Sequence, residues 1–348
     1  MPTIPPSSKI LVTGGTGYIG AWVVKFLLDR GLAVRAVVRS EAKATLLKEV
    51  FATEAGDGNL EFSIIEDPFA DGALDEAVKG VEGIAHLASP LTVQGDDPDD
   101  FIKPAVNGTL GVLKSALKNG STVKRIIITS SCAAVYTVQS EPGCWSESDW
   151  NDAALEQVRA QGKNADVMVK YRASKVLAER AAWDFYKKHQ GEVGWDLVVL
   201  NPPIVFGPAL LPGLTDPSAL GESMRYWYHF IIANTPKTAE MLHGSHGWVD
   251  VRDVAEAHAR SFERADLGGE RVIVYAGPFI WQEFVDIVNK IAPSVWPGHE
   301  ILKGFPIEEK AYRVRYSTEK QEKLLGLKYH TKEETTRDIL EDFKKRGW

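Results

Sequence analysis

The chain has 348 residues, of which 44% are hydrophobic and 25% charged, and its formal net charge is −7. This composition is typical of a soluble globular protein, and the lack of a basic block argues against a nucleic-acid partner. Two cysteines are too few for a disulfide framework or a thiolate metal site, so we expect no metal. The N-terminal residues lack a secretory pattern and no apolar run reaches the length of a membrane span, so we expect a cytoplasmic protein without a membrane partner.

The first predicted elements surround a set of glycines. A short apolar run at 10–13 (Ile-Leu-Val-Thr) precedes Gly14, Gly17 and Gly20, and an apolar-faced segment at 21–30 follows them. We predict a strand, a tight turn and a helix. This is the context in which glycines bind a dinucleotide, because they let the backbone approach a pyrophosphate at a helix N-terminus. The alternative is a tight turn with no ligand.

The second predicted strand, over 32–39, indicates which dinucleotide would bind. Folds that prefer NAD place an acidic residue at the end of this strand, on the ribose 2′-hydroxyl. This chain instead has Arg39 and Ser40, and then Lys43 on a helix predicted over 41–50. Because cationic side chains can hold a 2′-phosphate, we predict NADPH as the cofactor. The alternative is a solvated basic face on the helix.

Strands and helices continue to alternate along the first half of the chain. Further strands are predicted over 60–66, 83–88 and 124–129, with helices over 71–78 and 101–118. This order predicts an α/β fold with a Rossmann-type, doubly wound parallel sheet.

Two polar residues and one loop in these elements need an interpretation. Asp67 ends the third strand, where it is either a cofactor contact under the adenine or a turn residue before a proline. We expect His86, inside an apolar run, to be a buried and hydrogen-bonded core residue. The acidic loop at 96–100 is expected to be solvated.

The candidate catalytic residues follow the fifth strand. Tyr171 and Lys175 are four residues apart on a helix predicted over 166–189, so their side chains share one face. An ammonium near a phenol lowers the phenol pKa, and such a tyrosine can give a proton to a carbonyl oxygen as hydride arrives. A serine hydroxyl at the carboxyl end of the strand, Ser131 or alternatively Ser130, could bind the same oxygen. The alternative for Tyr171 and Lys175 is an ordinary surface pair.

The second half of the chain is predicted to supply a smaller mixed lobe. A strand over 195–201 is followed by an aromatic-rich helix over 221–233, whose large side chains could line an apolar substrate cleft, with Tyr226 and Trp227 as candidate substrate contacts. The other side chains that could line this cleft are Met224, Tyr228 and Phe230. A packing role is the alternative for any one of them. We expect three polar residues before the next predicted helix, over 254–264, to be structural. They are Asp250, Arg252 and Asp253.

Two domains are predicted. Residues 1–200 form a dinucleotide-binding Rossmann domain that includes the catalytic helix, and 201–348 form mainly a substrate-binding lobe. The segment at about 248–265 is expected to return to the Rossmann domain.

Several segments resemble, in their sequences and in their order along the chain, segments of the extended short-chain dehydrogenase/reductase family. Within it, the chain is similar to the dihydroflavonol reductase group and to its microbial aldehyde, ketone and methylglyoxal reductases. The resemblance covers about residues 8–330 and implies an NADPH-dependent oxidoreductase that reduces small aldehydes and ketones to alcohols. The matching segments are TGGTGYIG (13–20), TSSCAAV (129–135), YRASK (171–175) and NPPIVFGP (201–208).

The resemblance also implies roles for individual residues. Ser131, Tyr171 and Lys175 would be catalytic, and Lys175 would also bind the nicotinamide ribose. Arg39 and Lys43 would bind the 2′-phosphate. The other predicted cofactor contacts are Gly14, Thr16, Gly17, Tyr18, Ile19, Gly20, Asp67, Ala88, Pro202, Ile204 and Val205.

The resemblance implies a role for one more residue, and the sequence departs from one group of the family. Asn107 would belong to a proton-relay water chain. Cinnamoyl-CoA reductases carry Asn-Trp-Tyr-Cys-Tyr just before the catalytic lysine, whereas this chain has Met-Val-Lys-Tyr-Arg at 168–172. The departure argues against that substrate class.

Two other functions are compatible with the same fold. A nucleotide-sugar epimerase or dehydratase would hold NAD, which Arg39 and Lys43 disfavour. A non-catalytic NADP-sensing regulator would commonly lack the tyrosine or the lysine, and both are present here. The chain is expected to act as a monomer or a homodimer.

Overall fold

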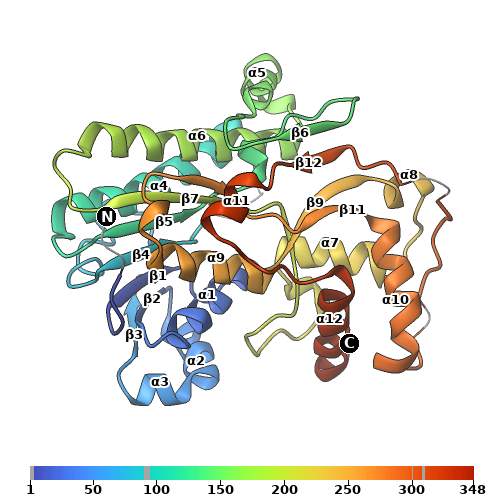
Figure 1. The fold of residues 1–348 in the computed structure, drawn as a ribbon, viewed down its shortest axis with the longest axis horizontal. Helices are drawn as coiled ribbons and strands as arrows, with labels where there is room; N and C mark the ends of the chain where they lie inside the picture. Colours follow the sequence, from blue (N-terminus) through green and yellow to red (C-terminus); the bar gives the residue numbers. More distant parts are fainter. Residues whose placement is uncertain (1–3, 90–94, 300, 308–309) are drawn as a thin grey trace.

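The computed structural model describes residues 4–89, 95–299, 301–307 and 310–348. Its centre is a seven-stranded sheet with the order β3-β2-β1-β4-β5-β7-β10, in which every pair is parallel (Figure 1). The predicted Rossmann-type α/β fold is therefore confirmed. The strands are β1 (Lys9–Thr13), β2 (Ala33–Val38), β3 (Leu60–Ile64), β4 (Gly83–His86), β5 (Arg125–Thr129), β7 (Asp196–Asn201) and β10 (Arg271–Ile273).

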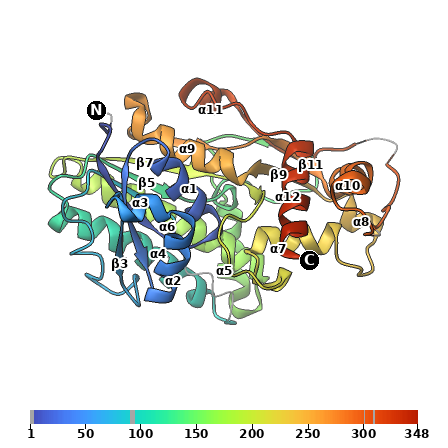
Figure 2. The same ribbon diagram turned by 90° about the horizontal axis from the view of Figure 1, so that it is seen from below.

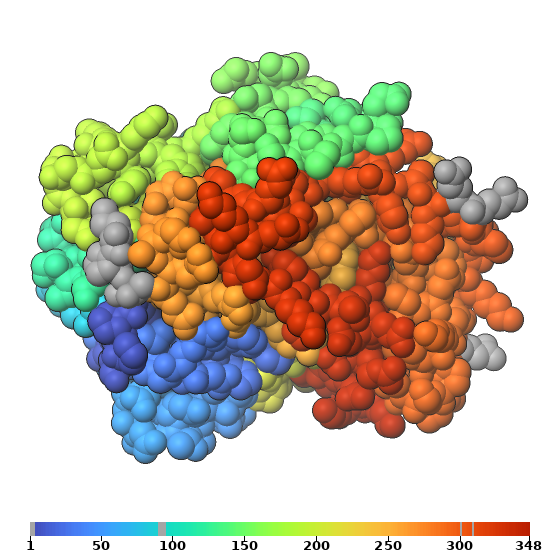
Figure 3. Space-filling model, viewed as in Figure 1, coloured from blue at the N-terminus to red at the C-terminus, as the bar shows by residue number. Residues whose placement is uncertain are grey.

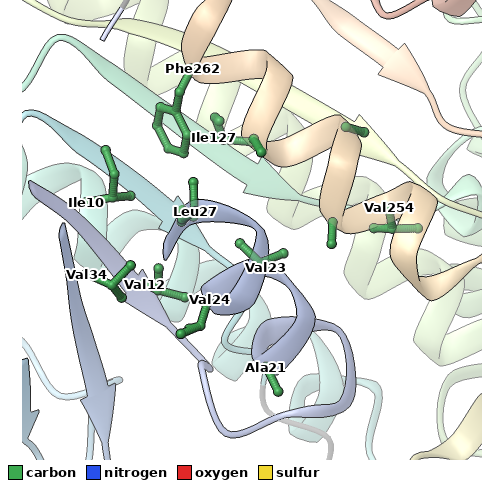
Figure 4. Close-up of a cluster of buried hydrophobic side chains, with 14 of the residues drawn as sticks. Ile10, Val12, Ala21, Val23, Val24, Leu27, Val34, Ile127, Val254 and Phe262 are labelled. Atoms are coloured by element: carbon green, nitrogen blue, oxygen red, sulfur yellow. The ribbon is translucent and has the colours of Figure 1, made fainter. Parts of the chain in front are cut away.

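Helices cover both faces of this sheet, which is why its strands are almost continuously apolar. Ile10 and Val12 of β1 belong to a buried cluster with α1 (Tyr18–Leu28) and α9 (Val251–Glu263), which Figure 4 shows between the sheet and the two helices. The intervening Leu11 belongs to the cluster on the opposite face. Side chains alternate along a strand, so one apolar run serves both layers.

The opposite face is covered by the two longest helices, α4 (Pro98–Asn119) and α6 (Val167–His189), which pack against each other. Val112 and Leu113 of α4 and Ala182 of α6 contribute to its core. Because α6 crosses this face, its N-terminal half lies at the carboxyl end of the strands, where ligands of such sheets bind.

The second half of the chain adds two small sheets. The first has the order β11-β9-β8 and the second pairs β12 with β6. Figure 2 shows α7, α8, α10 and α12 gathered at the end of the molecule away from β3. The strands are β6 (Gly143–Trp145), β8 (Ile204–Phe206), β9 (Ser245–Asp250), β11 (Gly277–Ile280) and β12 (Val314–Tyr316), and the helices are α7 (Glu222–Ile231), α8 (Ala239–Leu242), α10 (Trp281–Val295) and α12 (Lys332–Arg346).

The C-terminal part of the chain crosses between these two regions. Figure 3 shows the segment that contains α11 (Glu319–Leu324), in red, lying over the orange surface of α9. Arg260 of α9 donates to the backbone oxygen of Leu325 at 2.8 Å, and Leu324 and Leu325 are buried in the α1–α9 cluster. Thus α9 packs on the large sheet and β10 is one of its strands. The boundaries of the two domains stay a prediction.

The structure differs from the prediction at several local points. Residues 71–78 form successive turns in place of the predicted helix, because the chain takes positive φ values at Gly72 and Gly80. The apolar spacing was nevertheless informative, since Leu74, Ala77 and Val78 are buried. The sequence prediction also missed short elements, which are α3 (Ala52–Gly56), α5 (Asp152–Gln161), α8, α11, β6, β8, β11 and β12. The helix predicted over 41–50 is α2 (Glu41–Val50).

No helix in the described part of the chain is both long and apolar enough to cross a membrane.

Candidate active site

The glycine turn forms as its spacing predicts. Gly14 has a φ of +74°, and a Cβ there would lie 2.9 Å from the Ala88 backbone nitrogen. A Cβ at Gly20 would collide with the Gly14 carbonyl oxygen. Gly17 precedes the first residue of α1, and its side-chain position is open except for that same carbonyl oxygen, 3.1 Å away. The turn therefore leaves the helix N-terminus uncovered, as a phosphate-binding turn requires.

A cavity of about 400 Å³ opens over this turn, and we call it the glycine cavity. It runs from the end of β2 past the glycines to α6. Most of the predicted cofactor contacts line it: Gly14, Thr16, Gly17, Tyr18, Ile19, Gly20, Arg39, Lys43, Ala88, Tyr171, Lys175, Pro202 and Val205.

Two predicted cofactor contacts, and the residue predicted to belong to a proton relay, lie elsewhere. Asp67 is not among the lining residues and instead accepts a hydrogen bond from the Phe69 backbone at 3.0 Å, which is the turn role weighed as the alternative. Ile204 lines a second cavity rather than this one. The side chain of Asn107 is exposed on α4 and lines neither cavity, so this structure gives no support to a proton relay through it.

Arg39 and Lys43 face the glycine cavity from the end of β2 and the first turn of α2. Ser40 between them caps α2 by accepting from the Lys43 backbone at 3.4 Å. Both cationic side chains are exposed, and within the described residues neither pairs with a carboxylate. The residues thus fit an anionic group at this end of the cavity, where a dinucleotide fold places the adenosine ribose.

Tyr171 and Ser131 stand where the glycine cavity meets the second cavity, since both residues line both spaces. Burial raises the pKa of Tyr171 to about 12, a hydrogen bond with Ser131 lowers it in part, and the Glu222 carboxylate raises it. The phenol is therefore protonated at neutral pH. We expected Lys175 to lower this pKa, and in the free protein that expectation is wrong.

Lys175 lies beside the Tyr171 ring but hydrogen-bonds to another residue. Its Nζ lies 5.7 Å from the centre of the Tyr171 ring and donates to the Ser89 hydroxyl at 3.2 Å. Burial lowers the pKa of Lys175 to about 8, against a smaller opposing effect of Glu179. The lysine lines the glycine cavity but not the second cavity, so it faces the predicted cofactor side.

The two candidate serines have different surroundings. Ser130 donates to the Glu179 carboxylate at 2.6 Å, and that carboxylate also accepts from Asn201 and pairs with Arg271. Ser130 lines the glycine cavity but not the second cavity, and its hydroxyl is held in a buried polar network. Ser131 lies at the junction of the cavities and contacts Tyr171. This arrangement favours Ser131 as the substrate-binding hydroxyl.

The second cavity, which we call the aromatic cavity, has a volume of about 370 Å³. Tyr226 of α7 lines it, as predicted, and is 41% exposed. Trp227 does not: its side chain is fully buried and packs edge-on against Phe284 and Phe343. On a helix, neighbouring residues point in different directions, so only one of the two can face the cavity.

Most of this cavity was not predicted. Its walls come from the loop after β5, from α6, α7, β9 and β12, and from the start of α10, so no local pattern joins them. Phe230, on the predicted aromatic-rich helix, lines it as expected. Three of the lining residues that were not predicted are aromatic, one is cationic and one is a histidine. They are Tyr136, Trp281, Tyr316, Arg172 and His246.

The residues predicted to be structural are structural. His86 is 4% exposed and shares a 2.9 Å hydrogen bond with Thr13, and burial lowers its pKa to about 4. Asp250 caps α9 and pairs with Arg252 at 2.8 Å. Asp253 binds His330 at 2.6 Å. In the described residues no cluster of three or more histidine, cysteine or acidic side chains could hold a metal ion.

Known proteins are similar in sequence to this chain along nearly their whole length. The model of the NAD dependent epimerase/dehydratase family matches residues 10–277. Ketoreductase azaE of Aspergillus niger is 33% identical over 330 residues, which cover 93% of this chain and 94% of that protein. The NADPH-dependent methylglyoxal reductase GRE2 of Saccharomyces cerevisiae is 31% identical over 354 residues, covering 95% and 96%.

Solved structures agree with these matches. The yeast methylglyoxal/isovaleraldehyde reductase Gre2 complexed with NADPH has a TM-score of 0.85 and 29% identity, and the match covers 97% of this chain and 99% of that one. The NADPH complex of Gre2 from Candida albicans has a TM-score of 0.84 and 31% identity, covering 99% and 100%. The chain therefore belongs to the NAD dependent epimerase/dehydratase family, within the extended short-chain dehydrogenases/reductases that its motifs predict.

Proposed function

We propose that this protein reduces aldehydes and ketones to alcohols with NADPH. The observation that carries the proposal is the junction of the two cavities. A lining rich in glycine and cations on one side meets an aromatic lining on the other, and the Ser131 and Tyr171 side chains stand between them. A dinucleotide in the first cavity and a carbonyl compound in the second would both reach these two side chains.

The roles of the residues follow from their protonation states. NADPH, when bound, would supply the hydride that adds to the carbonyl carbon. Tyr171, protonated because its pKa is about 12, would give its proton to the carbonyl oxygen. Ser131 would donate a hydrogen bond to that oxygen as negative charge develops on it. Lys175 would bind the nicotinamide ribose and stabilise the phenolate that Tyr171 becomes.

Consumption of NADPH with a panel of small aldehydes and ketones tests the proposal, with NADH run in parallel. We expect turnover with NADPH and much slower turnover with NADH. Tight retention of NAD during purification, with no carbonyl reduction, would favour a nucleotide-sugar epimerase or dehydratase. NADP binding without any turnover would favour a sensor.

The pKa of Lys175 gives the proposal a pH dependence. Because burial lowers this pKa to about 8, the ammonium is lost as pH rises through about 8, whereas a free lysine would keep it to above 10. We expect kcat/KM for NADPH, which reports groups of the free enzyme, to fall about tenfold per pH unit above this point. A kcat/KM profile that stays flat to pH 10 would show that the Lys175 ammonium is not needed for the reaction.

Lys175→Arg is the matched variant for that profile. A guanidinium keeps its charge throughout this range, so the variant should be slower at pH 7 but should lose the decline above pH 8. The buried histidines do not confuse the result, because the pKa values of His86, His246 and His258 are each lowered to about 4 by burial.

We further propose that the protein acts in the cytoplasm as a monomer or a homodimer. Light scattering during size-exclusion chromatography would distinguish the two states.

A further inference from the structure

Arg172 brings into the aromatic cavity a guanidinium that pairs with no carboxylate of the described residues. It follows Tyr171 on α6 and lines that cavity, but not the glycine cavity. One of its Nη atoms donates to the Tyr136 hydroxyl at 3.0 Å, and its Cζ lies 5.4 Å from the centre of that ring. Other arginines nearby are paired: Arg180 with Asp152 at 2.7 Å and Arg271 with Glu179 at 2.5 Å. Within the described residues, no ion pair includes Arg172.

Those neighbours of Arg172 that the structure describes leave its charge uncompensated. His246 lines the same cavity, and its pKa is lowered to about 4 by burial and by the charge of Arg172, so it is neutral. Tyr136 accepts from Arg172, which leaves its own proton free to be donated. The ring of Tyr136 is held in place edge-on by Trp145 at 5.7 Å and Tyr316 at 6.4 Å. Arg172 and Tyr136 therefore present hydrogen-bond donors that have no acceptor in the described part of the chain.

The carboxylate that lines this cavity belongs to Glu222, in the first turn of α7. Its charge adds to the effect of burial in raising the pKa values of Tyr171 and Tyr226, and it forms no ion pair with Arg172. An anionic group is thus repelled on the side of Glu222 and attracted on the side of Arg172 and Tyr136. Such a charge separation would orient a substrate that carries one negative charge.

The apolar part of the cavity completes the recognition surface. Phe230 and Trp281 stack with ring centres 4.3 Å apart and an angle of 13° between their planes, and both line the cavity. A flat aromatic pair of this kind favours an aryl or other planar apolar group on the substrate.

We propose, on the basis of the proposed function, that the substrates are oxo acids, in which one molecule carries the reducible carbonyl, an apolar group and a carboxylate. Arg172 binds the carboxylate through two parallel N–H donors, and Tyr136 donates to it as well. The carbonyl then lies at Ser131 and Tyr171. Arg172 is a specificity residue and takes no part in the proton or hydride transfer.

Acids and their methyl esters test this proposal, because each pair differs only in the charge. The probes are phenylglyoxylate and 4-oxo-4-phenylbutanoate, which differ in the distance from the carbonyl to the carboxylate, and the methyl ester of each. We expect the wild type to favour one of the acids over its ester. Arg172→Gln should lower kcat/KM for that acid about ten- to a hundredfold and change the ester less than twofold, as expected for hydrogen bonds to a charged group.

Two further variants keep the result interpretable. Arg159→Gln removes the same charge from an exposed position on α5 outside both cavities and should change neither substrate. Tyr136→Phe should lower kcat/KM for the acid several-fold and spare the ester. An unchanged NADPH dissociation constant in Arg172→Gln would show that the variant is folded.

The possible failures are distinguishable. If the wild type reduces acids and esters equally well and Arg172→Gln affects both alike, the oxo-acid proposal is overturned while carbonyl reduction stands. If no carbonyl compound consumes NADPH, both proposals are overturned.

Discussion

Replacing Tyr171 with phenylalanine should lower kcat/KM for carbonyl reduction about a thousandfold and leave the NADPH dissociation constant unchanged within twofold. Phenylalanine keeps the ring beside Lys175, so the cavity wall and the packing of α6 are preserved. It removes the only group that we assign as proton donor, and a positioned general acid contributes about 10²- to 10⁴-fold. Steady-state rates with a reducible ketone and fluorescence titration with NADPH measure the two quantities.

Tyr186→Phe is the matched control, because it removes a hydroxyl from the same helix at a site remote from the cavities. Tyr186 stacks on Trp195 in the core at 5.6 Å and lines neither cavity. We expect wild-type rates from it. A Tyr171→Phe variant that retained a tenth of the wild-type rate would show that the proton comes from another group.

The large sheet could be predicted because its information is local. Strands such as β1 are apolar runs that serve two helical layers, and β1, β2 and β4 are each followed by a helix with a buried apolar face. The short strands β6, β8 and β12 could not be predicted. Each of these strands has only three residues, and its pairing partner is brought next to it only when the chain folds. Val314 of β12, for example, pairs with Gly143 of β6.

The parts of the site that are defined by short stretches of sequence could also be predicted, and the parts assembled by folding could not. The glycine turn, the two cations after β2 and the Tyr-x-x-x-Lys pair are each defined by a few consecutive residues, and the structure gathers them around one cavity. The aromatic cavity is built from side chains that are far apart in the sequence, such as Tyr136 and Trp281. Composition and periodicity therefore could not predict it. The aromatic-rich helix gave a partial signal, which correctly indicated Tyr226 and Phe230 but not Trp227.

The pKa of Tyr171 illustrates a different limit. Spacing on a helix indicated that Lys175 lies near the phenol, and it does. Spacing could not indicate how deeply the two groups lie below the surface, and burial has the larger effect on both: it raises the tyrosine pKa to about 12 and lowers the lysine pKa to about 8. In the free protein the phenol therefore holds its proton, which is the form that reduction of a carbonyl requires.

The cofactor preference should depend on Arg39 and Lys43. Each cation that binds a 2′-phosphate makes a charge-assisted hydrogen bond whose loss costs about ten- to a hundredfold in binding. We expect Arg39→Ala to raise KM for NADPH by this factor, and the double variant Arg39→Ala/Lys43→Ala to lower the ratio of kcat/KM for NADPH over NADH at least a hundredfold. KM for NADH, which has no 2′-phosphate, should change less than threefold.

Lys48→Ala is the control for the loss of charge. Lys48 lies on the same helix, is exposed and rests over the Phe62 ring at 5.2 Å, outside the glycine cavity. It should leave the cofactor ratio unchanged. Salt gives an independent test, because pairs between exposed cations and a phosphate are screened. Raising the ionic strength from 0.05 to about 0.5 M should weaken the NADPH preference of the wild type and leave the double variant unaffected. Equal loss of NADPH and NADH turnover in Arg39→Ala would mean that this side chain supports the fold of β2 and α2 and does not bind the 2′-phosphate of NADPH.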